Sequence, residues 1–289
     1  MAKVALVKVG EDTAAAVRSA VDLAGGLQIR TGMKVIIKPN VCNSKNPQGM
    51  VLTDFAIIEA VVKMVREKGG EPLVVESDNI ADTADTRVRE SGLMARLEKW
   101  GVSFLNLSTD ECASHEVAGT EIMIPKTMTS ADYVLNLAKM KTCAHTTVTL
   151  GIKNLYGCLQ EAKKSRLHKK LDEVLPYLAK TIRTDMTIVD GLTCMEGNGP
   201  VVGNSRKMGV VVAGLDVVAV DSFCVKLMGF EPEEIRHVAN AALLGVGQIS
   251  GYEVVGDPWE GFVCHFERPY SLKANIKSLG AVRDVYLKR

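Results

Sequence analysis

Apolar runs that end in polar residues recur along this chain, and the segments between them carry apolar residues at helical spacing. This alternation constrains the fold more than any other feature of the sequence. The runs cover residues 3–9, 33–41, 71–78 and 102–108, and helices are predicted between them at residues 13–24, 53–70 and 88–101. Near-continuous apolar runs are typical of strands that are buried on both faces of a parallel sheet. We therefore predict an α/β fold with a mostly parallel, mixed sheet and helices on both faces.

The second half of the chain also alternates predicted strands and helices. A strand is predicted at residues 131–141, and an amphipathic helix at residues 161–183, which Pro176 is expected to kink. Further strands and helices are predicted at residues 186–190, 207–214, 216–228 and 231–244. No linker or boundary is visible, so residues 1–289 are interpreted as a single α/β unit, with two subdomains as the alternative.

Charge and hydropathy exclude several classes of partner. The formal net charge is +1 and aromatic residues make up 5% of the chain, which argues against nucleic acid as a partner. No segment approaches the roughly 20 apolar residues of a membrane-spanning helix, and the first strand is interrupted by Lys8, unlike a signal peptide. We therefore expect a cytoplasmic protein without a membrane partner, with a homo-oligomer left open.

Seven cysteines are spread along the chain without any Cys-x-x-Cys pair. Zinc and iron–sulfur sites are normally marked by close cysteine spacing, so reduced and partly buried thiols are the simpler interpretation. The alternative is a metal or iron–sulfur site that gathers Cys143, Cys158 and Cys194, because these three cysteines lie in neighbouring glycine-containing motifs.

Polar residues mark the ends of the predicted strands. Parallel strands share their carboxyl edge, and ligands of such sheets bind beyond it. The predicted strand ends fall at residues 38–40, 76–78, 136–141, 190–191 and 214–216. We therefore predict a ligand site at this edge, with Lys38 and Asn40 at its first strand end.

Lysines cluster next to these strand ends. Lys139, Lys141 and Lys153 alternate with apolar and small residues, which favours binding of a phosphate or carboxylate, and Asn154 follows directly. The basic run at residues 163–170 is interpreted instead as a solvated helix face, because such runs usually stay in water.

A glycine-rich loop follows the strand that ends at Asp190. Gly197, Gly199 and Gly203 permit an irregular backbone that could present several N–H groups to an anion, and a structural turn is the alternative. Glu196 in this loop is a candidate general base or metal ligand.

Two aspartates and one histidine complete the candidate set. Asp216 is predicted to cap the following helix and is also a candidate ligand-binding residue. Asp221, inside an apolar helix start, needs a partner, for which Lys153 or another basic residue at a strand end is a candidate. His145 could act as an acid or base near neutral pH.

Three ordered motifs give the chain a family resemblance. The segments KMKTCAHTTVTLGIKNLYG, DGLTCMEGNGPVVG and GLDVVAVD, together with the upstream KPNV, resemble the uncharacterised domain-of-unknown-function family 362, roughly from Val35 to Gly247. Many members of that family are fused to ferredoxin-type modules, which implies electron transfer or reductive chemistry. This chain has no such cysteine-rich module, so the resemblance implies a separate ferredoxin-like partner. Members often carry a histidine where this chain has Cys143, and here His145 follows two positions later.

The leading hypothesis is an enzyme that acts on an anionic small molecule, with redox chemistry implied by the family resemblance. Lys38, Lys141 and Lys153 would hold the anion, the glycine loop would wrap it, and Asp190, Glu196 or His145 would supply acid–base chemistry. The alternatives are the three-cysteine metal site and a non-catalytic nucleotide- or metabolite-binding subunit of a redox partner. The cofactor stays open between an iron–sulfur cluster and a phosphorylated cofactor.

Overall fold

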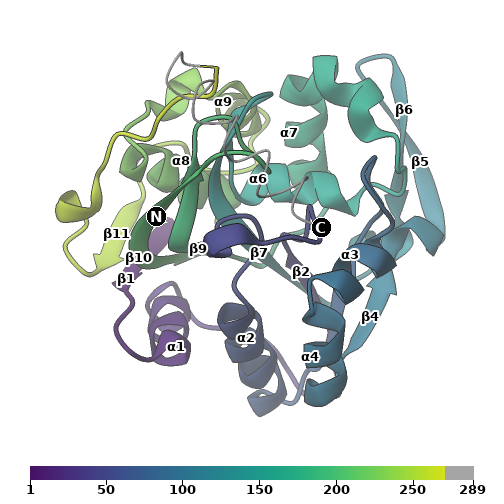
Figure 1. Ribbon diagram of the computed structural model, residues 1–289, viewed down its shortest axis with the longest axis horizontal. Coiled ribbons are helices and arrows are strands. Elements are labelled where there is room, and N and C mark those ends of the chain that lie inside the picture. Colours follow the sequence, from purple (N-terminus) through teal and green to yellow (C-terminus); the bar gives the residue numbers. More distant parts are fainter. Residues whose placement is uncertain (271–289) are drawn as a thin grey trace.

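A single nine-stranded sheet forms the centre of the computed structural model, which describes residues 1–270 (Figure 1). Eight strands lie across it in the order β11 (Glu253–Gly256), β1 (Lys3–Lys8), β10 (Asn204–Gly214), β9 (Met186–Glu196), β7 (Tyr133–Cys143), β2 (Lys34–Pro39), β3 (Glu71–Glu76) and β4 (Ser103–Asn106). The short β8 (Thr147–Thr149) pairs with the end of β7. All pairings are parallel except those of β10 with its two neighbours and of β8 with β7. The predicted mixed, mostly parallel sheet is confirmed.

Helices cover both faces of this sheet, as the apolar runs predicted. One face carries α1 (Thr13–Leu23), α2 (Phe55–Glu67), α3 (Ala84–Glu90) and α4 (Leu93–Trp100). The other carries α6 (Gly151–Asn154), α7 (Leu171–Thr181), α8 (Val217–Leu227) and α9 (Arg236–Leu243). None of the helices formed by residues 1–270 combines the length and the apolar character that a membrane span requires.

Shorter elements connect these layers. A separate hairpin of β5 (Cys112–Val117) and β6 (Thr120–Pro125) leads into α5 (Lys126–Thr129). Single 3₁₀ segments are η1 (Pro47–Gly49), η2 (Leu107–Thr109), η3 (Leu155–Cys158), η4 (Lys164–Lys170), η5 (Pro232–Glu234) and η6 (Glu260–Phe262). The interpretation of residues 1–289 as one unit extends beyond the described part of the chain.

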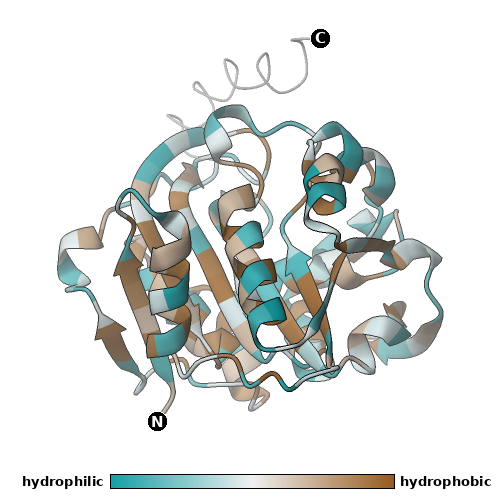
Figure 2. Ribbon diagram, turned by 90° about the horizontal axis from the view of Figure 1, so that it is seen from below, coloured by the Kyte–Doolittle hydropathy of each residue, from teal (hydrophilic) through white to brown (hydrophobic). Residues whose placement is uncertain are grey.

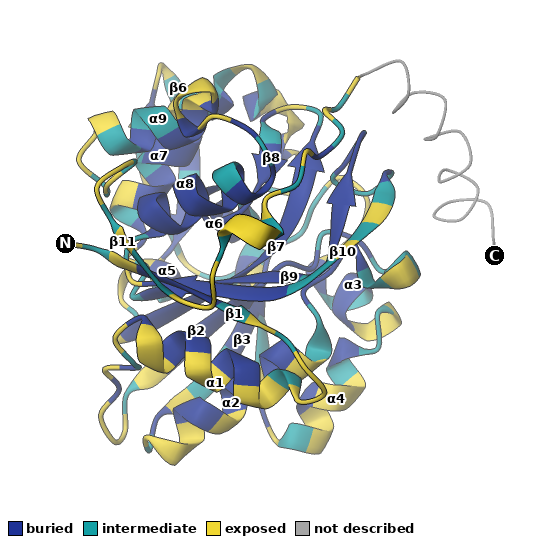
Figure 3. Ribbon diagram, turned by 90° about the vertical axis from the view of Figure 1, so that its left-hand side faces the viewer, coloured by how far each residue is buried: buried dark blue, intermediate teal, exposed yellow. Residues whose placement is uncertain are grey.

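The strands divide the interior into two apolar cores. Successive side chains of β7 point to opposite faces, so Leu135 and Leu137 join the core under α1 and α2, whereas Val134 and Ala138 join the core under α6 to α9. Figure 2 views the sheet from the α1–α2 side, with apolar strands behind helices that turn hydrophilic residues outward. Figure 3 shows the same layering as buried strands between helices with exposed outer faces.

Aspartates begin three of the long helices. Asp12 accepts a hydrogen bond from the backbone N–H of Ala15, and Asp54 accepts one from Ala56. Asp216 accepts from Val218 and Ala219, which confirms its predicted role as the cap of α8. Each cap satisfies amide groups that have no partner inside the helix.

Two predicted helices are wrong in detail. The helix predicted at residues 88–101 is broken by Gly92, whose φ of 82° is left-handed, and α3 and α4 form instead. The helix predicted at residues 161–183 is α-helical only from Leu171. Before it, the Tyr156 hydroxyl donates to the carbonyl of Lys164, which occupies a group that an α-helix would use internally. The hairpin β5–β6 was not predicted.

A buried ion pair ties the two central strands to α2. The ammonium of Lys139 lies 2.7 Å from the Oδ2 atom of Asp190, and both side chains are fully buried. Asp190 also accepts hydrogen bonds from the backbone N–H groups of Asp54 (2.7 Å) and Leu192 (3.0 Å). The pair therefore joins β7, β9 and the start of α2.

Substituting Lys139→Met is expected to lower the free energy of unfolding by about 3–5 kcal/mol, because the carboxylate of Asp190 would stay buried without its counter-ion. Urea unfolding measures this. Lys63→Met is the matched control, since Lys63 forms only an exposed pair with Glu59 and should cost less than about 1 kcal/mol. Equal losses for the two variants would contradict the structural role of the buried pair.

Candidate functional site

A cleft of about 290 Å³ opens where β2, β3 and β7 end. Its floor comes from the segments after these strands, and α6, η3 and η4 close one side. Pro200 and Val201 from the loop between β9 and β10 complete the wall. The cleft therefore lies at the carboxyl edge of the parallel strands, where the sequence predicted a ligand site.

Lys141 reaches into the cleft from the end of β7. Its ammonium donates to the Oδ1 atom of Asn40 (2.8 Å) and to the carbonyl of Val51 (2.9 Å), and it lies 3.4 Å from the Sγ atom of Cys42. Asn40 in turn donates to Asn154 (3.0 Å), and Asn154 donates to Asn136 (2.8 Å). This chain of amides fixes the position of Lys141, but none of its members carries a negative charge.

Lys153 enters the cleft from α6. Its ammonium lies 4.1 Å from the centroid of the Tyr156 ring, and no group among residues 1–270 accepts a hydrogen bond from it. Burial lowers the pKa of Lys153, and the nearby Lys141 lowers it further, whereas Cys143 and Cys42 oppose this. Lys153 is thus a partly buried amine with a ring face as its neighbour.

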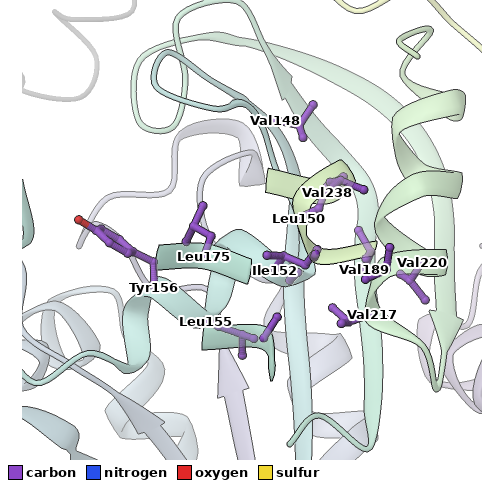
Figure 4. Close-up of a cluster of buried hydrophobic side chains, with 14 of the residues drawn as sticks. Val148, Leu150, Ile152, Leu155, Tyr156, Leu175, Val189, Val217, Val220 and Val238 are labelled. Atoms are coloured by element: carbon purple, nitrogen blue, oxygen red, sulfur yellow. The ribbon is translucent and has the colours of Figure 1, made fainter. Parts of the chain in front are cut away.

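Two features hold α6 in place. The carboxylate of Asp221 on α8 accepts hydrogen bonds from the backbone N–H groups of Gly151 (2.7 Å) and Ile152 (2.8 Å). Figure 4 shows Ile152 and Leu155 packed among Val217 and Val220 of α8 and Val189 of β9, with the Tyr156 hydroxyl pointing away from this cluster. Burial raises the pKa of Asp221 to about 7, although the two backbone hydrogen bonds oppose the rise.

Lys164 and Arg87 form the other cationic wall. The Lys164 ammonium donates to the Ser77 hydroxyl (2.6 Å) and to the carbonyl of Asp78 (2.5 Å). The Arg87 guanidinium donates to the carbonyls of Val41 and Ser77. Burial lowers the pKa of Lys164 to about 8. The interpretation of residues 163–170 as a solvated helix face is therefore wrong for Lys164, which is only 5% exposed.

Cys143 lies in the cleft next to two histidines. Burial alone would raise the pKa of its thiol, but the hydrogen bond from His145, the charge of Lys153 and the hydrogen bond from Thr146 lower it to about 6. The centroids of the His145 and His168 rings lie 4.0 Å apart. Burial, His145 and Lys153 lower the pKa of His168 to about 4, so it is neutral at pH 7. The neighbours of Cys143 therefore favour its thiolate form.

The cations of the cleft differ from the other buried lysines in their partners. Lys38 is paired with Glu76 (2.9 Å) and Lys139 with Asp190 (2.7 Å). Within residues 1–270, no carboxylate forms an ion pair with Lys141, Lys153, Lys164 or Arg87. Four cationic side chains therefore line the cleft without a carboxylate ion pair, and the ionised thiol of Cys143 offsets part of their charge.

Only some of the predicted site residues line this cleft. Asn40, Lys141, Cys143, His145, Lys153 and Asn154 do. Lys38 lies directly behind it, with its ammonium held by Glu76 and by the carbonyl of Pro39. Lys139 and Asp190 are enclosed in their own pair, so neither faces the cleft.

The glycine loop packs against β7 and β9. The Thr142 hydroxyl donates to the carbonyl of Gly197 (2.7 Å), and Ala144 N–H donates to that of Gly199 (3.0 Å). A Cβ atom at Gly199 would lie 2.0 Å from the carbonyl oxygen of Thr142, and one at Gly203 would lie 2.6 Å from that of Glu196. These glycines permit close backbone contact, which places Pro200 and Val201 in the cleft wall.

Three acidic candidates lie away from the cleft. Glu196 forms an ion pair with Arg206 (2.7 Å) and accepts a hydrogen bond from the backbone N–H of Glu267. Asp216 lies at the opposite edge of the sheet because β10 runs antiparallel to β9, so the prediction of a shared edge was wrong for this residue. Asp221 binds the backbone N–H groups at the start of α6, and not Lys153 or another basic residue as predicted.

The three cysteines of the metal alternative do not come together. Cys143 lines the cleft, whereas Cys158 and Cys194 are buried in the core beside α6 to α9. Burial raises the pKa of Cys158 to about 12 and also raises that of Cys194. Within the described residues, no group of three or more histidine, cysteine, aspartate or glutamate side chains is arranged to hold a metal ion.

Several cleft residues were not predicted. Cys42 and Asn43 directly follow the KPNV strand end, and Ser77 directly follows β3 within the predicted strand end at residues 76–78, so their positions carried a signal. Arg87 and Lys164 gave none, because both lie in charge-rich segments that are typical of exposed helices.

Comparisons with known proteins place the chain among relatives of unassigned chemistry. A family described as Domain of unknown function (DUF362) matches residues 35–226. A thylakoid-associated protein of Synechocystis sp. is 28% identical over 241 residues, which cover 80% of this chain and 75% of that protein. A crystal structure of a Thermotoga maritima protein aligns with a TM-score of 0.43 and 11% identity, over 75% of this chain and 59% of the other. This chain therefore spans less than two thirds of that structure's length.

Alkylation by iodoacetamide should label Cys143 with a pH midpoint near 6, because the thiolate is the reacting form. Peptide mass spectrometry measures the rate at each pH. Cys112 is an internal control, since it is less buried but burial and Asp110 raise its pKa to about 11. His145→Ala should raise the Cys143 midpoint. A wild-type midpoint at the ordinary thiol value of about 8.5 would contradict the described arrangement.

Proposed function

This chain belongs to the family described as Domain of unknown function (DUF362). From that premise we propose that it is an enzyme. Its cleft binds a small anionic molecule, and the thiolate of Cys143 attacks this molecule. The observation that carries the proposal is the set of cations without carboxylate partners. Lys141, Lys153 and Lys164 point into one cleft and have only neutral or no hydrogen-bond acceptors among residues 1–270.

A cation that is withdrawn from water needs a negatively charged partner. Burying an ammonium group without a counter-ion is costly, and the other buried lysines of this fold each have one. A carboxylate or phosphate bound in the cleft would supply the missing negative charge. Lys153 is the strongest candidate contact, since its ammonium has no acceptor within the described residues.

The chemical step assigned to Cys143 follows from its neighbours. A thiolate at neutral pH is a nucleophile, and His145 and Lys153 both favour the charged form. In this proposal Lys141 and Lys153 hold the anionic group while the sulfur adds to an adjacent carbonyl carbon. The C=O π bond opens, its electron pair moves to the oxygen, and His145 supplies the proton that neutralises this oxygen. His145, which lies at the exposed mouth of the cleft, would exchange the proton with water.

Redox chemistry is the second candidate, favoured by two thiols in one cleft. Cys42 and Cys143 both line it, and both influence the pKa of Lys153. Oxidation by a disulfide would form a Cys42–Cys143 bond, with two electrons and two protons passing to the disulfide, which becomes two thiols. A separate ferredoxin-like partner, as the family resemblance implies, would return two electrons. All seven cysteines are unpaired, which suits the reducing cytoplasm that we propose as the compartment.

Substituting Lys153→Gln should weaken the binding of inorganic phosphate by about tenfold to a hundredfold, as expected for loss of a hydrogen bond to a charged group. Isothermal titration calorimetry at fixed ionic strength measures this. Lys169→Gln is the matched control, because Lys169 is exposed on η4 and should leave the affinity unchanged. Equal affinities for wild type and Lys153→Gln would remove the anion site assigned to this residue.

Anaerobic incubation with oxidised glutathione should produce an internal Cys42–Cys143 disulfide, seen as a loss of two hydrogens in the intact mass and as a linked peptide pair. Cys42→Ser should instead retain glutathione on Cys143, because no second thiol is available to release it. Persistent glutathione on Cys143 of the wild-type protein would exclude the dithiol function and leave the nucleophile proposal standing.

A further inference from the structure

The cations of the cleft fall into two sets that come from different elements. The inner set is Lys141 at the end of β7 and Lys153 on α6. The outer set is Arg87 on α3 and Lys164 on η4. We propose that the outer set is a second anion subsite, so that the ligand carries two anionic groups joined by a short uncharged spacer. This inference rests on the proposed function, since it specifies the ligand of the same cleft.

The outer set is built from buried groups with neutral partners. Lys164 is 5% exposed and Arg87 is 2% exposed. Their acceptors are the Ser77 hydroxyl and the backbone carbonyls of Val41, Ser77 and Asp78. The Arg87 Nε atom is buried and has no acceptor within the described residues. The two side chains are therefore held in place by the fold while their charge is left for a ligand.

Among the described residues that line the cleft, Glu76 is the one carboxylate, and it already has a partner. Glu76 lines the cleft, but its Oε2 atom lies 2.9 Å from the ammonium of Lys38 and also accepts from the backbone N–H of Val41. Arg87, Lys38 and Lys164 thus face a single negative charge. Two positive charges remain, which matches one phosphate or one carboxylate with a further hydrogen-bonding group.

The two sets respond to different charges. The pKa of Lys164 is lowered by burial and by Arg87 and Lys38, and Glu76 opposes this. The pKa of Lys153 is lowered by burial and by Lys141, and Cys143 and Cys42 oppose this. An anion on one set would therefore leave the positive charge of the other largely unbalanced.

Tyr156 connects the two sets. The Lys153 ammonium lies over its ring at 4.1 Å, and its hydroxyl donates to the backbone carbonyl of Lys164. Gly157 follows it in the lining, and a Cβ atom there would lie 2.6 Å from Glu76 Oε1 and 2.9 Å from Lys38 Nζ. An aromatic face and a glycine present no charge between the subsites, which fits an uncharged spacer. A dicarboxylate or a phosphorylated carboxylic acid has this chemistry.

Calorimetry at fixed ionic strength tests this second subsite. It compares the affinities of malonate, succinate, glutarate and adipate with that of the monocarboxylate of equal carbon number. Fixed ionic strength keeps screening equal for both series. One dicarboxylate should bind wild type at least about tenfold more tightly than its monocarboxylate, and the ratio should peak at one chain length. Lys164→Gln should reduce that ratio to about one, because the second carboxylate of the ligand loses its contact.

Two controls separate the outcomes. Lys163→Gln changes an exposed neighbour and should keep the wild-type ratio, whereas Lys153→Gln should weaken both series. Dicarboxylates that bind no more tightly than monocarboxylates would overturn the second subsite and leave the proposed anion site intact. Absence of binding for both series would overturn the anion site as well. The chain-length profile of wild type decides the matter even where Lys164→Gln does not fold.

Discussion

An ammonium group withdrawn from water must find negative charge or several good acceptors, and this requirement organises the centre of the molecule. Strand β7 contains two lysines with buried side chains. Lys139 forms an ion pair with the carboxylate of Asp190, which also accepts a hydrogen bond from the start of α2. Lys141, two residues further, meets an amide, a backbone carbonyl and a thiol. Lys139, with a charged partner, therefore has a structural role. Lys141, with neutral partners on the same strand, can contact a ligand.

The walls of the cleft depend on contacts with groups that lie outside it. The short helix α6 has few internal hydrogen bonds, so its position depends on Asp221 at its start and on the apolar contacts with α8 and β9 (Figure 4). The glycine loop has a comparable supporting role, since its backbone packs on β7 and presents Pro200 and Val201. Side chains supported in this way can keep their geometry without a ligand, which is what a preorganised site requires.

The sequence predicted the layers of the fold and part of the site, and the failures have identifiable causes. Apolar runs with helices between them were sufficient for the sheet, and polar strand ends located Asn40, Lys141 and Lys153 at its carboxyl edge. Strand direction is not encoded in an apolar run, so Asp216 was assigned to the wrong edge. The burial of Lys164 depends on Ser77 and Asp78, which are distant in sequence, and a local basic run cannot reveal such partners.

The place of β1 in the sheet has a consequence for how the protein is made. Val4 pairs with Gly214 in β10, and Lys3 pairs with Glu253 in β11. Strand β1 must therefore wait, unpaired and apolar, until β10 and β11 have been synthesised. Pairings between such distant segments form slowly because a long loop has to close first. The nascent chain thus exposes a strand edge throughout translation, and this is the interval in which protection by a chaperone would matter most.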